Sequence, residues 1–350
     1  MNTVSVQNVS MRFGDFTAVN DVSFTVAKGE FVTLLGPSGC GKTTLLNMVS
    51  GFLQPSSGKI EIGGNDVTFV PPERRDTAMC FQSYALFPHL SVAENLQFGL
   101  KQKKMLPADR KRRLDDVAEK LDLVAQLDKL PNQLSGGQQQ RVALGRALTM
   151  RPSVVLFDEP LSNLDAKLRE SVRLEIRKIQ ADYNLAAIYV THDQGEALAM
   201  SDRILIMRSG QIEQSGTPTD IYNFPKSSFV ADFIGNANIL DATIIKEESR
   251  NSWLVSTEIG EFLVKSDTAP VAKQLKICWR PENAQHGGAE LNSIEARVTH
   301  RAFQGNYTDL FIEINGVAQR VQWREGRLED LTNLSMHIRP EDFTFLEAIT

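Results

Sequence analysis

The sequence contains few cysteines, no long apolar run and no excess of positive charge. Its three cysteines, Cys40, Cys80 and Cys278, are widely spaced and odd in number, which argues against a disulfide framework and is typical of a reducing compartment. No window approaches the roughly 18 consecutive apolar residues of a membrane-spanning helix. The start, MNTVSVQNVSMRFG, lacks the basic and apolar regions of a secretory signal. Because 43 Asp and Glu outnumber 38 Lys and Arg, a nucleic-acid partner is not expected.

The chain is long enough for two domains, since 350 residues exceed the usual size of one. Its first 235 residues alternate strand-like and helix-like patterns. Helical patterns occupy 42–50, where Gly51 is placed to end the helix, and 166–180. Short apolar runs typical of buried strands occur at 31–35, 154–157, 186–190 and 204–207. Strands separated by helices predict an α/β domain with a mostly parallel sheet over residues 1–235.

The pattern changes after residue 235. Short β-rich pieces separated by turn glycines predict a small all-β domain over 236–350. Inside it, CWRPEN (278–283) and HIRPED (337–342) share the tripeptide Arg-Pro-Glu. The match is either chance or the mark of two related strand ends.

A phosphate-binding loop is predicted at residues 36–43, GPSGCGKT. The segment matches G-x-x-x-x-G-K-[ST] between an apolar strand and a helix. Glycines let backbone N–H groups face a phosphate, and the helix directs its positive end to the same place. Lys42 can reach the β- and γ-phosphates, and Thr43 can bind Mg²⁺. Cys40 lies beside this helix N-terminus, which could lower its pKa, so we hypothesise that its alkylation blocks ATPase activity. The alternative is a tolerated small residue.

Two adjacent acids end the apolar run 154–157. Asp158 and Glu159 lie at the carboxyl end of a strand, where parallel α/β sheets bind ligands. Adjacent strand residues point to opposite faces, so the two acids have different expected roles. Asp158 would hold Mg²⁺, and Glu159 would polarise the attacking water.

A further glycine pair precedes a helical pattern in Leu134-Ser135-Gly136-Gly137-Gln138. Ser135 suits a helix N-cap, and two glycines at a helix start can form a second anion-binding site. On the residues alone, a plain N-cap turn remains the other interpretation.

Together, LSGGQ, the preceding phosphate loop and the following Asp-Glu strand resemble the ATP-binding-cassette (ABC) family over about residues 3–235. The family's other motifs occur in order. Gln82 in FQSYALFPH resembles the Q-loop glutamine, Ser162-Asn163-Leu164-Asp165 the D-loop, and His192 in YVTHDQGEA the switch histidine. Phe13 occupies the place of the adenine-stacking aromatic, where Tyr or Trp is commoner. The Arg-Pro-Glu segments resemble the small OB-like β domain (TOBE domain) appended to bacterial importer ATPases.

The resemblance implies a P-loop ABC ATPase domain with a β subdomain and a helical subdomain at roughly 85–150. It assigns catalysis to Lys42, Gln82, Glu159 and His192. It assigns Mg²⁺ binding to Thr43, Gln82 and Asp158. It assigns ATP contacts to Phe13, Gly36, Pro37, Ser38, Gly39, Cys40, Gly41, Lys42, Thr43, Thr44, Ser135, Gly136, Gly137, Gln138 and Asp165.

The resemblance also implies partners. Two copies would enclose two ATP molecules, each between the phosphate loop of one copy and the LSGGQ segment of the other. Two separate membrane subunits would contact residues 82–90, although local packing of Leu86 and Phe87 also explains that apolar segment. The chain would lie peripherally on the cytoplasmic face of the inner membrane, and an external solute-binding protein would act indirectly.

The cargo is the least determined property. The segments 81–95 and 233–240 resemble the polyamine, ferric iron and phosphonate branches more than the sugar branch. A maltose-type sugar importer remains the alternative. Non-transport ABC ATPases insert a long coiled coil between phosphate loop and signature, and no sustained heptads occur here. A P-loop small-molecule kinase would lack the LSGGQ segment and the switch histidine.

Overall fold

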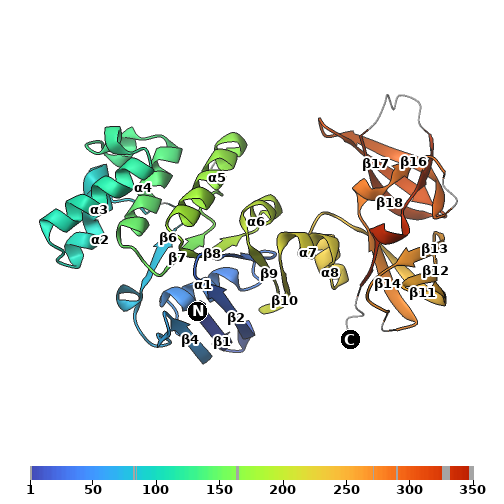
Figure 1. Cartoon of the computed structure of the whole chain (residues 1–350), viewed down its shortest axis with the longest axis horizontal. Helices are drawn as coiled ribbons and strands as arrows, with labels where there is room; N and C mark the ends of the chain where they lie inside the picture. Colours follow the sequence, from blue (N-terminus) through green and yellow to red (C-terminus); the bar gives the residue numbers. More distant parts are fainter. Residues whose placement is uncertain are drawn as a thin grey trace. The chain divides into compact units, whose positions relative to one another are not determined.

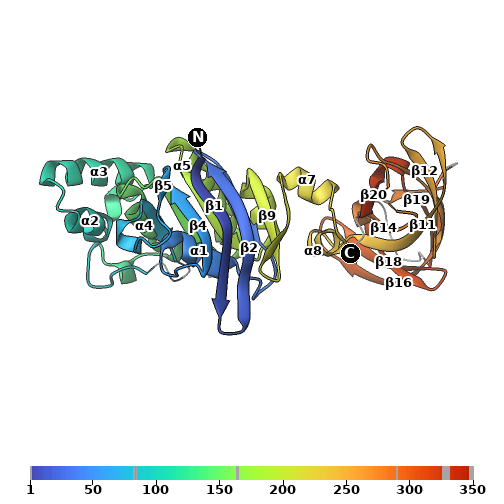
Figure 2. The same ribbon diagram turned by 90° about the horizontal axis from the view of Figure 1, so that it is seen from below.

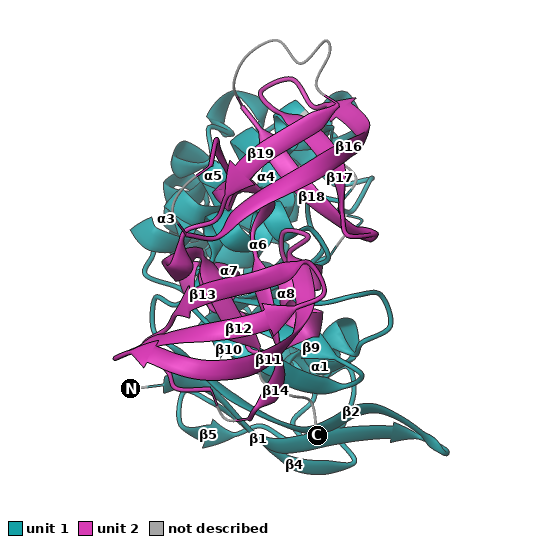
Figure 3. Ribbon diagram, turned by 90° about the vertical axis from the view of Figure 1, so that its right-hand side faces the viewer, with its two compact units in different colours: residues 1–218 teal, residues 219–350 magenta. Residues whose placement is uncertain are grey.

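The computed structural model describes residues 2–81, 83, 85–162, 165–270, 272–288, 291–324 and 332–346 (Figure 1). The chain forms two compact units, residues 1–218 and 219–350, coloured teal and magenta in Figure 3. Among the described residues, no helix is both long and apolar enough to cross a membrane.

A mostly parallel sheet forms the centre of the first unit, with the strand order β10-β9-β3-β8-β7-β6. Its strands are β3 (Phe31–Leu35), β6 (Thr77–Cys80), β7 (Val154–Asp158), β8 (Ala186–Thr191), β9 (Arg203–Arg208) and β10 (Gln211–Gly216). β10 pairs antiparallel with β9, and the other pairs are parallel. β3 and β8 are buried along their whole length, as parallel strands covered on both faces are. The apolar runs predicted as buried strands are confirmed.

An antiparallel sheet with the order β2-β1-β4-β5 forms the β subdomain. Its strands are β1 (Asn2–Phe13), β2 (Phe16–Ala27), β4 (Ser57–Ile62) and β5 (Asn65–Asp66). Figure 2 shows β1 and β2 as a long ribbon with β4 beside β1. Val4 and Val6 of β1 are buried, and they share a core with Leu45 and Leu46 of helix α1. This sheet therefore packs beside the helix that follows the phosphate loop.

Three helices of the first unit adjoin the parallel sheet: α1 (Lys42–Ser50), α5 (Ala166–Asp182) and α6 (Gln194–Met200). α1 ends at Gly51, which has a φ of 91°. Glycine adopts this left-handed conformation without steric cost, so the predicted helix end is confirmed. The helix predicted at 166–180 is confirmed, and Val172, Ile176 and Ile179 are buried along one of its faces.

The helical subdomain contains α2 (Val92–Gln102), α3 (Pro107–Lys120) and α4 (Gly136–Thr149). Figure 1 shows α2, α3 and α4 grouped at one end of the first unit. Short 3₁₀ helices precede or separate these elements at η1 (Pro72–Arg74), η2 (Val124–Gln126) and η3 (Pro131–Gln133). Apolar residues of α2, α3 and α4 share a core with Phe157 of β7 and Tyr189 of β8. This core connects the LSGGQ helix α4 to the strands that carry the acids and the histidine.

The second unit is built from two antiparallel sheets, which confirms the predicted all-β domain. One has the order β13-β12-β11-β14-β20 and the other β15-β19-β16-β17-β18. Their strands are β11 (Asn238–Ser249), β12 (Ser252–Thr257), β13 (Gly260–Lys265), β14 (Gln274–Trp279), β15 (Gln285–His286), β16 (Ser293–Phe303), β17 (Thr308–Ile314), β18 (Val317–Trp323), β19 (Asn333–His337) and β20 (Phe343–Leu346). Figure 3 shows the strands of both sheets in magenta. Both sheets contribute to one apolar core.

Two short helices precede these sheets, α7 (Pro218–Asn223) and α8 (Ser228–Phe233). The buried guanidinium of Arg280 donates to the carbonyl oxygen of Ala231 at 2.9 Å and to that of Tyr222 at 2.6 Å. Arg280 thereby attaches both helices to β14. The compact unit consequently begins at residue 219, whereas the change in sequence pattern placed the boundary at 235/236.

The two Arg-Pro-Glu segments occupy equivalent places in an internal repeat, whose first half contains β11 to β15 and whose second half contains β16 to β20. Each follows a strand and forms a 3₁₀ helix, η4 (Pro281–Asn283) or η5 (Pro340–Asp342), that leads into a strand of the other sheet. β15 pairs with β19, and β20 pairs with β14. The last strand of each repeat is therefore exchanged into the sheet of the other, and the sequence match marks related strand ends.

Candidate functional site

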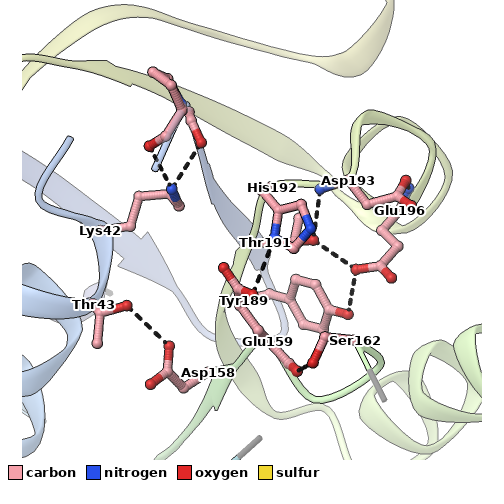
Figure 4. A network of polar contacts seen from close by, with 12 residues as sticks. Lys42, Thr43, Asp158, Glu159, Ser162, Tyr189, Thr191, His192, Asp193 and Glu196 are labelled. Atoms are coloured by element: carbon pink, nitrogen blue, oxygen red, sulfur yellow. Dashed lines mark hydrogen bonds and ion pairs between the residues drawn. The ribbon is translucent and has the colours of Figure 1, made fainter. Parts of the chain in front are cut away.

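The phosphate loop joins β3 to α1 and requires glycine at two tight positions. A Cβ atom on Gly36 would lie 2.3 Å from the carbonyl oxygen of Met207, and one on Gly41 would lie 2.5 Å from that of Ala18. Gly41 also has a φ of 101°. Lys42 is buried, and its ammonium donates to the carbonyl oxygens of Gly36 at 2.7 Å and of Pro37 at 2.9 Å (Figure 4). The loop is thus closed around a fixed positive charge.

Thr43, at the start of α1, meets Asp158, at the end of β7. The Thr43 hydroxyl donates to Oδ1 of Asp158 at 3.3 Å (Figure 4). Burial raises the pKa of Asp158 above its ordinary value, although the hydrogen bond from Thr43 opposes the shift. A hydroxyl and a carboxylate that converge beside a phosphate loop are the hard oxygen donors that Mg²⁺ prefers. A bound cation would offset the burial of Asp158.

Glu159 turns away from Asp158 and meets His192. Its Oε2 lies 3.0 Å from Nδ1 of His192 (Figure 4). Glu159 has a φ of 44°, and its N–H donates to the carbonyl oxygen of Val190. The hydroxyl of Ser162 donates to the carbonyl oxygen of Glu159 at 3.0 Å. The left-handed backbone and its two hydrogen bonds fix the carboxylate at the end of the sheet, partly exposed to solvent.

A buried polar network supports the loop of His192. The Glu196 carboxylate is 4% exposed and accepts hydrogen bonds from Tyr189 at 2.8 Å and from Thr191 at 2.7 Å. The N–H of Asp193 donates to the hydroxyl of Thr191, and burial raises the pKa of Tyr189. This network was not predicted. The sequence signal for it is that Tyr189 and Thr191, which carry hydroxyl groups, alternate with apolar residues in a strand expected to be buried.

The LSGGQ segment forms the N-terminus of α4. Ser135 caps the helix. Its hydroxyl accepts from the N–H of Gln138 at 3.4 Å, and the N–H of Ser135 donates to Oε1 of Gln138 at 3.0 Å. The predicted N-cap is confirmed. Among the described residues, no hydrogen bond or ion pair joins 135–138 to 36–43. Within one copy, the described parts of the two glycine-rich segments therefore share no polar contact.

The hairpin between β1 and β2 presents two phenylalanines. Phe13 and Phe16 are paired directly across the two-residue turn, and both are exposed, by 48% and 63%. Side chains directly opposite in antiparallel strands lie on the same face. Phe16 was not singled out from the sequence, although the close spacing in Phe-Gly-Asp-Phe is the signal. Ala18, further along β2, lies against the phosphate loop at Gly41.

The remaining predicted site residues lie on the phosphate loop, at the starts of α1 and α5, or outside the described residues. Pro37, Ser38 and Gly39 are exposed on the phosphate loop, and Thr44 follows it in α1. Asp165 caps α5, since its Oδ1 accepts from the N–H of Leu168 at 2.9 Å. Gln82, Asn163 and Leu164 lie outside the described residues.

Cys40 has an environment unlike the one expected. It is 4% exposed, and burial raises the pKa of its thiol despite the opposing charge of Lys42. The expectation that the helix N-terminus lowers this pKa was wrong. The loss of hydration at a buried site outweighs the lowering effect of the Lys42 charge and of the hydrogen bonds to the thiol.

A phosphate loop, a threonine–aspartate pair and a glutamate–histidine pair at the carboxyl ends of parallel strands define a P-loop ATPase. The sequence pattern of the ABC transporter family matches residues 19–162. The chain belongs to the ABC transporter family, as an ATP-hydrolysing protein of the import type.

Two import ATP-binding proteins are similar to this chain over most of its length. The Fe(3+) ions import ATP-binding protein FbpC of Agrobacterium fabrum is 46% identical over 89% of this chain and 88% of its own length. The spermidine/putrescine import ATP-binding protein PotA of Pseudomonas aeruginosa is also 46% identical, over 89% of this chain and 87% of its own length. A solved ATP-binding cassette of an ABC transporter is 26% identical, with a TM-score of 0.57 over 63% of this chain and 95% of that one.

Proposed function

We propose that two copies of this chain hydrolyse ATP at two shared sites and drive uptake of a polyamine, ferric iron or a phosphonate-like solute through two membrane subunits. The observation that carries the proposal is the pair Glu159–His192 at 3.0 Å beside the pair Thr43–Asp158 at 3.3 Å (Figure 4). The first pair suits activation of a water molecule, and the second suits a phosphate-bound cation.

Each ATP would contact residues of both copies. Backbone N–H groups of 36–43 and the ammonium of Lys42 would hold the phosphates, with Thr44 adjoining them. Phe13 would stack on adenine. Ser135 to Gln138 of the second copy would cap the γ-phosphate, and Asp165 would adjoin the same interface. Within one copy, 135–138 makes no hydrogen bond or ion pair with 36–43 among the described residues, and Ser135 and Gly136 are exposed. This supports the arrangement, because the N-terminus of α4 is available to a phosphate held by a second copy.

The water reaction would depend on residues that this chain positions. The Glu159 carboxylate would accept a proton from water aligned with the γ-phosphorus. His192, held by Glu159 through Nδ1, would use its other ring nitrogen toward the γ-phosphate. Partner closure would exclude bulk water from the site. Gln82, at the start of the segment after β6, would sense the γ-phosphate.

The fit of Mg²⁺ rests on the donor set. Thr43 and Asp158 would hold the ion, with Gln82 as a further ligand. When bound, the ion would neutralise charge that develops on the β- and γ-phosphates. Few protein oxygens suffice, because Mg²⁺ keeps waters and takes phosphate oxygens as its other ligands.

We place the membrane subunits against residues 82–90, the docking segment. Its described residues include exposed Ala85, Pro88 and His89. Phe87 packs against Phe98 with ring centroids 4.3 Å apart, so local packing accounts for part of this segment and docking would use its exposed residues. The chain would therefore lie on the cytoplasmic face of the inner membrane, with an external solute-binding protein delivering the cargo.

The relatives support two cargoes equally, since the Fe(3+) and the spermidine/putrescine import proteins are both 46% identical to this chain. The test is reconstitution of the chain with its membrane subunits and binding protein in proteoliposomes. ATPase activity and uptake are measured with ferric iron, spermidine, a phosphonate and maltose. Stimulation by one of the first three supports the proposal. Stimulation by maltose alone favours the sugar importer, and no stimulation by any solute contradicts the proposed cargo class.

A further inference from the structure

Arg146 connects the LSGGQ helix to the docking segment. It lies on α4, and its Nη1 donates to the carbonyl oxygen of Ala85 at 2.5 Å. Its guanidinium carbon lies 5.4 Å from the centroid of the Phe87 ring, within the range of a cation–π contact. One side chain of α4 thus holds both the backbone and a ring of the docking segment.

The contact holds a backbone that would not keep its shape alone. Ala85 has a φ of 47°, in the left-handed region that residues other than glycine seldom adopt. Such a conformation is strained unless the surroundings stabilise it. The hydrogen bond to its carbonyl group from Arg146 is one such stabilising contact.

The rest of the docking segment is attached to a different helix. Asn95 of α2 is fully buried, and its Oδ1 accepts from the N–H of Phe87 at 2.9 Å. Its Nδ2 donates to the carbonyl oxygens of Phe87, Leu90 and Ser91. Asn95 therefore gives the segment its shape, whereas Arg146 connects it to the helix that begins at Ser135.

We propose that Arg146 is a positioning residue that transmits the movement of α4, when its N-terminus engages ATP, to the docking segment. The inference rests on the proposed function, because it needs both the shared ATP site and the docking segment. Gly136 and Arg146 are separated by about 15 Å along α4, at 1.5 Å per residue. A helix of this length moves as a rigid body, so a shift at its N-terminus displaces the Ala85 carbonyl group as well.

The chemistry requires arginine rather than a positive charge alone. A planar guanidinium donates in its plane while its face covers an aromatic ring. Lysine keeps the charge but cannot make both contacts in this geometry. Arg146→Lys should therefore weaken the connection while leaving the helical subdomain folded.

Arg113 of α3 provides a matched control, because it binds the other end of the same helix α4. Its Nη1 donates to the carbonyl oxygens of Thr149 at 3.1 Å and of Met150 at 3.3 Å, at the end of α4. Like Arg146, it is half-buried and binds main-chain carbonyl groups, but its contacts lie outside the docking segment. Arg113→Lys measures the general cost of such a replacement.

The experiment compares wild type, Arg146→Lys, Arg146→Met and Arg113→Lys. Basal ATPase is measured on the isolated chain, and stimulated ATPase is measured after reconstitution with the two membrane subunits. We expect unchanged basal activity and assembly for Arg146→Lys, with stimulation reduced about fivefold or more. Arg113→Lys should keep wild-type stimulation. Amide exchange of residues 85–90 in the isolated chain should accelerate in both Arg146 variants and not in Arg113→Lys.

Equal stimulation in Arg146→Lys and Arg113→Lys, with unchanged exchange at 85–90, would overturn the inference. If Arg146→Met does not fold, judged by its melting temperature, Arg146→Lys still decides the question. A wild-type chain that neither assembles with the membrane subunits nor responds to them would instead contradict the proposed function. The two failures are thus distinguished by the wild-type arm.

Discussion

Nδ1 of His192 lies 3.0 Å from Oε2 of Glu159, although 33 residues separate them in the sequence. β7 and β8 are neighbouring parallel strands, so both residues follow strand ends at the same edge of the sheet. The register places Asp158 opposite Val190, the residue two positions before His192. The pairing of strands therefore determines the separation of the proposed base from its histidine.

Replacing Glu159 by Gln should slow ATP hydrolysis by about 10² to 10⁴-fold, because an amide cannot accept the proton of the attacking water. ATP binding should persist, and the variant should accumulate as an ATP-bound dimer. Turnover and size-exclusion chromatography with Mg²⁺ and ATP measure both effects. Glu61→Gln, a half-buried glutamate paired with Lys59, is the control. Near-normal turnover in Glu159→Gln would remove Glu159 from its proposed role.

The raised pKa of Asp158 predicts how pH affects the stability of the nucleotide-free chain. Burial raises this pKa above the ordinary 3.8, so folding favours the neutral acid. The stabilising contribution is complete below about pH 4 and is lost as the pH rises through the folded-state pKa. Mg²⁺ and ATP favour the carboxylate, so the increase in melting temperature that they give should grow with pH over this window.

Thermal melts of wild type and Asp158→Asn between about pH 4 and 7, with and without Mg²⁺ and ATP, measure this effect. The asparagine variant controls for the titration of the nucleotide itself. An identical pH dependence in both proteins would show that Asp158 does not hold the cation.

Burial of Cys40 predicts slow alkylation that accelerates with pH. Since its pKa is raised, little thiolate exists near neutrality, and the thiolate is the reactive form. Burial raises the pKa of Cys80 and of Cys278 to about 12, so Cys40 should react first. An adduct would enlarge a side chain whose Sγ lies 3.8 Å from Nζ of Lys42 and should block ATPase activity.

N-ethylmaleimide labelling at increasing pH, followed by mass spectrometry and ATPase assay, measures the rate and its effect. ATP should slow the reaction, and Cys40→Ser should be resistant. Full turnover after complete modification of Cys40 would disprove the blocking role.

Phe13 and Phe16 predict a graded effect on nucleotide affinity. Stacking of a base on an aromatic ring contributes about 1–3 kcal/mol, so Phe13→Ala should weaken ATP binding by about 5- to 150-fold. Phe16→Ala should have a smaller effect, because its ring lies on the same face but across the turn. Isothermal titration with ATP measures both. Phe311→Ala, an exposed aromatic of the second unit, is the control, and equal affinities in all variants would refute adenine contact at the hairpin.

Local patterns allowed much of this architecture to be predicted. The apolar runs at 31–35 and 186–190 predicted strands that are buried in the structure, and the glycine-rich segments predicted the loops and helix starts that the structure contains. Residues whose partners are distant in sequence were not predictable in the same way. Glu196 is recognisable only once β8 and α6 bring Tyr189 and Thr191 to it, and the bond from Arg280 to Ala231 spans 49 residues.

The boundary between the units and the pKa of Cys40 differ from expectation for a similar reason. Both depend on burial by segments that the local sequence does not specify. The catalytic, nucleotide-binding and metal-binding roles assigned to individual residues remain predictions, and Gln82 lies outside the described residues.

The exchange of β15 and β20 between the sheets has a consequence for how the second unit can be shortened. Each half supplies the outermost strand of the other, next to β19 and β14. A chain that stopped after the first half would leave β14 without its neighbour and β15 without a sheet to join. Exposed strand edges of this kind recruit other chains. Premature termination in this region should therefore yield aggregates, whereas deletion of the whole unit removes both edges together.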